Sequence, residues 1–121
     1  MIRRVGAFGE AWTCGYLTRR GYRIIERNVR LSRGEIDIVA SQGDALVFVE
    51  VKTRRSRAFG SPQSSITHAR YRRLANAVEE YLSARGLEPA RYRIDVVALE
   101  LGPSGDVIHC ELIENAEDPA G

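Results

Sequence analysis

Lysine is almost absent from this chain of 121 residues, in which only one of the 18 basic residues, Lys52, is a lysine. Every other basic residue is an arginine. The arginine guanidinium stays protonated in proteins, whereas the lysine amine is a compact charge whose pKa shifts readily with its surroundings. We therefore expect position 52 to need an amine for a specific chemical purpose.

Cysteines and long apolar runs are also scarce. The two cysteines, Cys14 and Cys110, are too few for a disulfide framework, and this favours a reducing compartment. No apolar run approaches the ~20 residues of a membrane span, and the first six residues lack the apolar stretch of a secretory signal. These absences predict a cytoplasmic protein with no membrane partner.

The length and an ordinary composition, with 44% hydrophobic and 28% charged residues, predict one globular domain. We assign residues 1–113 to this domain and residues 114–121 to an acidic C-terminal tail that we expect to be frayed. Residues 111–121 hold four of the sixteen acidic residues and no basic residue, so the net charge of +2 is unevenly distributed.

The basic residues gather in two clusters. These clusters are Arg54, Arg55 and Arg57, and then Arg70, Arg72 and Arg73. Clustered arginines suit a phosphate backbone, which makes these six residues candidates for nucleic-acid binding. A solvated surface in an arginine-rich protein would look the same, and charge alone does not separate the two interpretations.

Apolar spacing and turn residues predict an α/β fold with the element order α-β-β-β-α-β-β. The two helices are predicted at residues 6–20 and 67–85, and the strands at 22–31, 35–40, 46–53, 92–101 and 107–113. The first three strands can form an antiparallel meander, and a right-handed crossover through the second helix can place the fourth strand parallel to the third. The expected architecture is a mixed β-sheet flanked by helices.

Two acidic residues and the single lysine are predicted to share one patch of the sheet. Side chains alternate along a strand, so Glu50 and Lys52 lie on one face. A turn centred on Gly43 and Asp44 pairs residues whose numbers sum to 87, which places Asp37 opposite Glu50. Two opposed carboxylates repel each other and destabilise a sheet, so a bound cation is expected to offset the repulsion.

The chemistry of this patch suits a divalent metal ion. Mg²⁺ takes oxygen ligands, commonly one or two carboxylates with waters and substrate phosphate. Asp37 and Glu50 are the predicted ligands of Mg²⁺ or Mn²⁺, with the backbone carbonyl of Val51 as a third. Lys52 can orient a water molecule, accept its proton, or stabilise charge that develops on a phosphate. In the alternative interpretation, Glu50 and Lys52 are a polar pair on an edge strand and Asp37 bonds a nearby arginine.

Glu10 is a further candidate ligand. It lies on the same stripe of the first helix as Ala7, Cys14 and Leu17, and this stripe is expected to face the sheet. Glu10 can add a metal ligand directly or through water, or it can cap the helix or pair with an arginine.

Several short motifs together resemble the YraN-like family of small bacterial proteins over residues 6–100. The motifs are Gly9-Glu10, Gly21-Tyr22, Arg27-Asn28, Gly34-Glu35-Ile36-Asp37, Phe48-Val49-Glu50-Val51-Lys52-Thr53-Arg54, Phe59-Gly60 and Arg93-Ile94-Asp95-Val96-Val97. That family is placed in the PD-(D/E)xK nuclease superfamily, which has a restriction-endonuclease-like fold with an αβββαβ core, similar to archaeal Holliday junction resolvases.

The resemblance implies roles for residues of this chain. Asp37, Glu50 and Lys52 correspond to the catalytic residues of the superfamily, and Glu10 corresponds to its first-helix acid. Ile36 precedes Asp37, where the superfamily often has a proline. Relatives tend to carry a lysine near Arg70.

Three functional hypotheses follow. The first is a Mg²⁺- or Mn²⁺-dependent endonuclease that hydrolyses phosphodiester bonds of DNA, including branched or structured DNA. The second is a nucleic-acid-binding module that keeps the fold without cleaving, and the third is a protein-interaction adaptor that uses the acidic tail or a sheet edge. Analogy with resolvases, which cut two strands, also predicts a homodimer.

Overall fold

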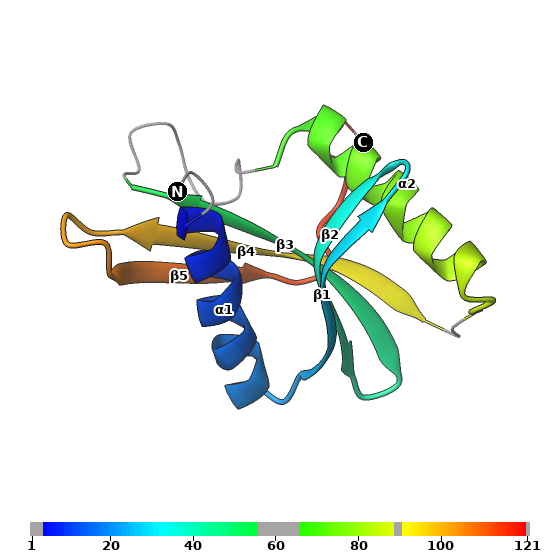
Figure 1. The fold of residues 1–121 in the computed structure, drawn as a ribbon, viewed down its shortest axis with the longest axis horizontal. Coiled ribbons are helices and arrows are strands. Elements are labelled where there is room, and N and C mark those ends of the chain that lie inside the picture. The colour runs from blue at the N-terminus through cyan, green and yellow to red at the C-terminus, as the bar shows by residue number, and fades with distance from the viewer. Residues whose placement is uncertain (1–3, 56–65, 89–90, 121) are drawn as a thin grey trace.

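The computed structural model describes residues 4–55, 66–88 and 91–120, which form one five-stranded sheet and two helices (Figure 1). In chain order the elements are α1 (Arg4–Arg19), β1 (Arg23–Leu31), β2 (Gly34–Gln42), β3 (Ala45–Arg54), α2 (His68–Ala84), β4 (Tyr92–Leu101) and β5 (Val107–Ile113). The strands lie side by side in the order β1-β2-β3-β4-β5. The β3–β4 pair is parallel and the other pairs are antiparallel. The predicted α/β class, element order and mixed sheet are confirmed.

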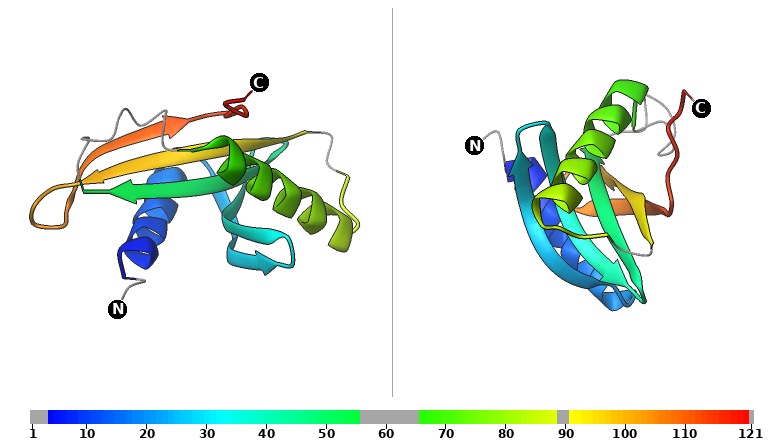
Figure 2. Two further views of the ribbon diagram at one scale, coloured as in Figure 1. Left: turned by 90° about the horizontal axis from the view of Figure 1, so that it is seen from above. Right: turned by 90° about the vertical axis from the view of Figure 1, so that its right-hand side faces the viewer.

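Each helix packs on its own side of β3, because side chains alternate along this strand. Val47 and Val49 belong to the apolar cluster that Leu17 of α1 joins. Phe48, between them, belongs to the cluster that contains Leu74 of α2. The two helices therefore lie over different parts of a strongly twisted sheet (Figures 1 and 2).

The hairpin between β2 and β3 has the predicted register over half of its length. Paired residues sum to 87 from Gln42 and Ala45 at the turn to Ile38 and Val49. The pairing ends there, so Asp37 and Glu50 are not joined as a ladder pair. Instead, the Val51 amide donates a hydrogen bond of 2.8 Å to Oδ2 of Asp37. The Asp37 carboxylate thus takes the place of a backbone acceptor at the point where β2 leaves β3.

The departure of β2 follows from contacts between the β1–β2 turn and α2. The amides of Ser32 and Arg33 donate to the Glu80 carboxylate at 3.2 and 2.9 Å. Gly34 lies so close to α2 that an added Cβ would be 3.2 Å from the Arg73 carbonyl oxygen. This turn is therefore anchored on α2 rather than on β3, and Figure 2 shows it separated from β3.

The acidic tail has defined partners in this structure. The Asn115 amide donates to Asp95 Oδ1 at 2.9 Å, and the Ala116 amide donates to the Ile94 carbonyl at 2.7 Å. Asp118 Oδ1 lies 2.7 Å from Nδ1 of His68, in the first turn of α2. Residues 114–120, which we expected to be frayed, thus bridge β4 and α2.

Within the described ranges, neither helix combines the length and the apolar character needed to cross a membrane.

Candidate active site

Two buried carboxylates form the centre of the site. The side chains of Asp37 and Glu50 belong to residues that are only 6% and 1% exposed. Asp37 accepts the Val51 amide, and Glu50 Oε2 accepts a 2.6 Å hydrogen bond from Nε of Arg70, on α2. No hydrogen bond from the described residues reaches the other Glu50 oxygen, Oε1.

Burial dominates the electrostatics of this pair. Loss of solvent raises the pKa of Asp37 to about 6, and the nearby Glu10 and Glu35 charges add to the rise, while the Val51 amide and the Arg70 charge oppose it. Burial, followed by the Asp37 charge, also raises the pKa of Glu50. A cation that binds beside these acids stabilises their charged forms, which burial disfavours. Acids with pKa values shifted in this way are common at functional sites.

Glu10 lies close to Asp37, as its place on the helix stripe suggested. Burial raises the pKa of Glu10, and hydrogen bonding with the side chains of Asp37 and Asn28 opposes this rise. The neighbouring Gly9 permits this arrangement, because an added Cβ there would be 2.5 Å from Oγ1 of Thr53 on β3. A residue without a side chain thus lets α1 approach β3 and brings Glu10 to the acidic pair.

Asn28 is a site residue that pattern analysis missed. It lies in β1 with a φ of +52°, a left-handed conformation that asparagine tolerates better than most residues. The side chain reaches Glu10 from this position. The Arg27-Asn28 motif was its only sign in the sequence, because strand periodicity cannot reveal a left-handed residue.

Lys52 lies beside Glu50 as predicted. The side chain is half-buried, and the Lys52 charge is among the influences that lower the pKa of Glu50 against the effect of burial. Lys52 has no hydrogen-bond or ion-pair partner in the described part of the chain. Its ammonium group can therefore take a partner from solution.

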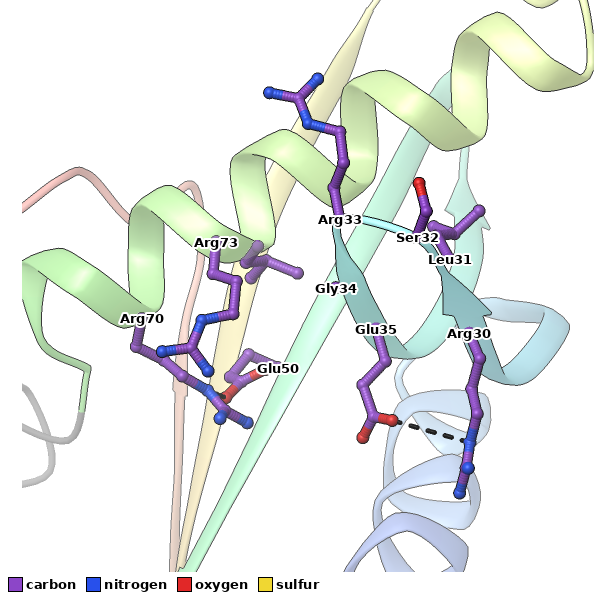
Figure 3. Close-up of a pocket in the computed structure, with 10 residues that line it drawn as sticks. Arg30, Leu31, Ser32, Arg33, Gly34, Glu35, Glu50, Arg70 and Arg73 are labelled. Atoms are coloured by element: carbon purple, nitrogen blue, oxygen red, sulfur yellow. Dashed lines mark hydrogen bonds and ion pairs between the residues drawn. The ribbon is translucent and has the colours of Figure 1, made fainter.

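A pocket of about 550 Å³ opens next to Glu50, between the β1–β2 turn and α2 (Figure 3). Its charged lining residues are Arg30, Arg33, Glu35, Glu50, Arg70 and Arg73. We call this the arginine-lined pocket. Arg70 and Arg73 come from a predicted cluster, whereas Arg30 and Arg33 were missed, because only the docking of the β1–β2 turn on α2 brings them there. The Arg33 side chain points away from Glu50, and Arg30 pairs with Glu35 at 3.7 Å (Figure 3).

Three of the other predicted arginines, Arg54, Arg55 and Arg72, are not among the residues that line this pocket. Arg72 lies near the tail, where its charge and, more strongly, a His68 hydrogen bond lower the pKa of Asp118. Arg54 and Arg55 follow the acidic pair at the end of β3. Arg57 lies outside the described residues.

The oxygen donors present suit a hard divalent cation. In the described part of the chain, no three acidic, histidine or cysteine side chains form a metal-holding group. Asp37 and Glu50 nevertheless supply the one or two carboxylates that Mg²⁺ commonly takes from a protein, with waters and phosphate completing the shell. The residues therefore fit Mg²⁺ or Mn²⁺ as a two-carboxylate site, with Glu10 adjacent rather than completing a three-acid cluster.

Fold and site together define a small mixed α/β protein with a buried acidic pair beside a basic pocket. Residues 9–99 match the model of the uncharacterised protein family UPF0102, and the chain belongs to this family. It is 53% identical over 116 residues to the UPF0102 protein STH1475 of Symbiobacterium thermophilum, covering 96% of this chain and 98% of that protein. A UPF0102 protein of Moorella thermoacetica is 46% identical, with 94% of this chain and 95% of that protein covered. The YraN-like resemblance is thereby confirmed.

Among solved structures, Pyrococcus furiosus SfsA in complex with Ca²⁺ matches 96% of this chain and 63% of that one, with 18% identity and a TM-score of 0.34. This similarity is too low to support a conclusion about function.

Proposed function

We propose that this protein is a divalent-metal-dependent endonuclease of the PD-(D/E)xK type, which hydrolyses phosphodiester bonds of DNA, including branched or structured DNA. The observation that carries the proposal is the burial of Asp37 and Glu50 beside the single lysine, at the edge of the arginine-lined pocket. A buried acidic pair is costly to the fold unless cations or hydrogen bonds compensate its charge, and a bound metal ion would add to the compensation that Arg70 provides. The αβββαβ order of the first six elements also supports this superfamily.

Each residue has a defined role in this proposal. Asp37 and Glu50 would hold Mg²⁺ or Mn²⁺ together with the Val51 backbone carbonyl, and Glu10 would add a ligand directly or through water. When bound, the metal would act as a Lewis acid toward the phosphate and would lower the pKa of a water molecule that it binds. Lys52 orients that water or donates to the phosphate as negative charge develops.

The arginines hold the nucleic acid in this proposal. Arg70 and Arg73 bind a phosphate in the pocket, since guanidinium groups match phosphate oxygens in pairs. Flanking phosphates are bound by the remaining arginines of the two clusters, which are Arg54, Arg55, Arg57 and Arg72. A homodimer in the cytoplasm is the expected state of an enzyme that cuts both strands of a duplex.

The first test is calorimetric titration with Mn²⁺ and then Mg²⁺, comparing wild type with Asp37→Asn, followed by cleavage assays on linear and branched DNA. We expect metal binding in wild type and its loss in Asp37→Asn. Cleavage should fall by about a hundredfold or more in Lys52→Ala, the scale of a lost acid–base or charge-stabilising group. Undiminished cleavage by both variants would contradict the proposal.

A nucleic-acid-binding module without cleavage is the second candidate. The Arg70–Glu50 ion pair favours it, because a protein cation already neutralises one of the two carboxylates. This candidate predicts salt-dependent DNA binding without metal-dependent cleavage. Neutralising Arg70, Arg72 and Arg73 together should then reduce the slope of log K against log salt by about 0.9 for each phosphate that the protein no longer neutralises.

A further inference from the structure

Glu50 and Arg70 form the closest ion pair at the pocket. The Glu50 side chain is only 2% exposed, whereas the Arg70 side chain is 40% exposed, and Arg70 Nε lies 2.6 Å from Glu50 Oε2. A carboxylate buried in the sheet is thus neutralised by a cation that starts on the surface of α2. Without that cation, Glu50 and Asp37 would be two buried anions in close proximity.

Arg70 acts on both carboxylates. Burial raises the pKa of Asp37 and of Glu50, and the Arg70 charge opposes this rise in each case. One positive charge therefore favours the ionised form of both acids, as a bound metal ion also would. The Arg70 guanidinium therefore occupies a position whose electrostatic environment would also favour a metal cation.

Arg70 also lines a pocket in which a second anion can be accommodated. It lines the arginine-lined pocket with Arg73, and Figure 3 shows the Arg73 side chain pointing toward the same region as Arg70. Guanidinium has five N–H donors, of which only Nε is used on Glu50. A phosphate in the pocket would offer Arg70 the paired oxygens that arginine binds best.

We propose that Arg70 is the resting counter-cation of Glu50 and is released when the site is loaded. In this exchange Glu50 passes from Arg70 to a divalent cation, and Arg70 passes from Glu50 to a phosphate of the nucleic acid in the pocket. The inference rests on the proposed function, since it assumes metal at Asp37 and Glu50. Arg70 thus couples metal binding to substrate binding.

The test starts from metal-free, full-length protein, with Mn²⁺ affinity measured by calorimetry and thermal stability measured with and without Mn²⁺. Arg70→Ala should melt at a lower temperature than wild type without metal, because Glu50 is left as a buried, unpaired charge. It should bind Mn²⁺ about tenfold more tightly or better, because a competing positive charge is gone. Mn²⁺ should therefore raise its melting temperature more than that of wild type.

A second variant, Arg70→Gln, covers the case in which Arg70→Ala does not fold. Its side-chain amide can still donate a hydrogen bond to Glu50 but carries no charge. We expect Arg70→Gln to bind Mn²⁺ more tightly than wild type as well.

The chain offers a matched control in its other buried arginine–carboxylate pair. Arg93 Nε lies 3.0 Å from Oδ1 of Asp95, which is fully buried. Arg93→Ala should also lower the melting temperature, but Mn²⁺ should not restore it, because the structure places no other acid among the hydrogen-bond partners of Asp95 in the described ranges.

A second measurement tests the transfer of Arg70 to phosphate, using fluorescence anisotropy with a labelled branched DNA. Arg70→Ala should weaken DNA binding in the presence of Ca²⁺ and have little effect in EDTA, where wild-type Arg70 remains on Glu50. Arg73 has no ion-pair partner among the described residues, so Arg73→Ala should weaken binding in both conditions.

The outcomes separate this inference from the function on which it rests. Unchanged or weaker Mn²⁺ binding by both Arg70 variants, with wild-type binding that Asp37→Asn abolishes, would overturn the exchange and leave the metal site intact. Equal weakening of DNA binding by Arg70→Ala with and without Ca²⁺ would overturn it as well. Absence of Mn²⁺ binding in wild type and in both variants would overturn the metal site, and the exchange with it.

Discussion

Asp37 combines deep burial with a hydrogen bond from the Val51 amide, and its pKa rises to about 6 from a usual value of 3.8. The folded state therefore holds a proton at pH values where the unfolded chain has already released it. The contribution of this bound proton to the free energy of unfolding is fully present below about pH 4 and is lost as the pH rises through about 6. At neutral pH the metal-free protein carries a buried charge that opposes folding.

Asp37→Asn should therefore stabilise the metal-free protein at neutral pH. Asparagine can still accept the Val51 hydrogen bond through Oδ1, but it carries no charge. We expect a gain of about 1–3 kcal/mol in the free energy of unfolding at pH 7.5, which shrinks toward zero near pH 4. Urea denaturation at a series of pH values measures the difference. A variant less stable than wild type at pH 7.5 would contradict the assigned cost of the Asp37 charge.

At the residue scale, the sequence predicted the central groups of the candidate site better than their surroundings. Asp37 and Lys52 lie close enough to Glu50 for their charges to shift its pKa, although Asp37 and Glu50 are not the ladder pair that the turn at Gly43 predicted. The partnership of Glu50 with Arg70 was not predicted, because it joins a strand to a helix across 20 positions of sequence, in a geometry that periodicity does not encode. The catalytic roles of Asp37, Glu50 and Lys52 and the metal-binding roles of Asp37 and Glu50 stay predictions.

Among the elements, α1 depends on a close approach to β3. Gly9 faces Thr53, and no side chain fits between them without movement. Gly6 lies on the same helix and an added Cβ there would meet nothing within 4 Å. Alanine substitution at both positions adds the same helix propensity, but only the substitution at Gly9 adds a steric clash with β3. A comparison of the two variants therefore isolates the effect of the clash.

Gly9→Ala should destabilise the protein by about 1–3 kcal/mol, the usual cost of overpacking. The displaced helix should also move Glu10 away from Asp37 and weaken Mn²⁺ binding. Gly6→Ala is the control and should be neutral or stabilising by up to about 1 kcal/mol, because alanine favours helix. Chemical denaturation of both variants measures the contrast, and equal stabilities would show that the α1–β3 contact adapts freely.

The strand register shows where sequence reasoning reaches its limit at this scale. Alternation and the hairpin turn correctly predicted pairing up to Ile38 and Val49. They failed to predict the end of the ladder, because it depends on Glu80 and Gly34 contacts between the β1–β2 turn and α2. Such contacts join segments that are distant in the sequence and have no local signature.

Across the whole molecule, the acidic tail connects the sheet to the helix that carries Arg70. Its amides bond Asp95 and the Ile94 carbonyl, and Asp118 contacts His68 at the start of α2. Composition alone suggested a solvated end, since charge and the absence of apolar periodicity are typical of frayed termini. Backbone hydrogen bonds, which leave no trace in composition, hold the tail instead.

Truncation after Ile113 should lower the free energy of unfolding by about 1–3 kcal/mol, because buried Asp95 loses a donor and the Ile94 carbonyl loses another. Glu117→Gln changes an exposed tail acid and serves as the control, with no more than a small effect expected. Urea denaturation compares the three proteins. Full stability of the truncated chain would support a frayed tail after all.

The isolation of Lys52 has a spectroscopic consequence. Because it is the only lysine, protein grown with lysine labelled with ¹⁵N at Nζ alone has one labelled nitrogen, and this nitrogen belongs to a side chain beside Glu50 that has no bonding partner among the described residues. A single NMR resonance then reports on the candidate site with no assignment needed. Binding of a cation or a nucleotide can be followed there, in a chain whose seventeen arginines stay spectroscopically silent.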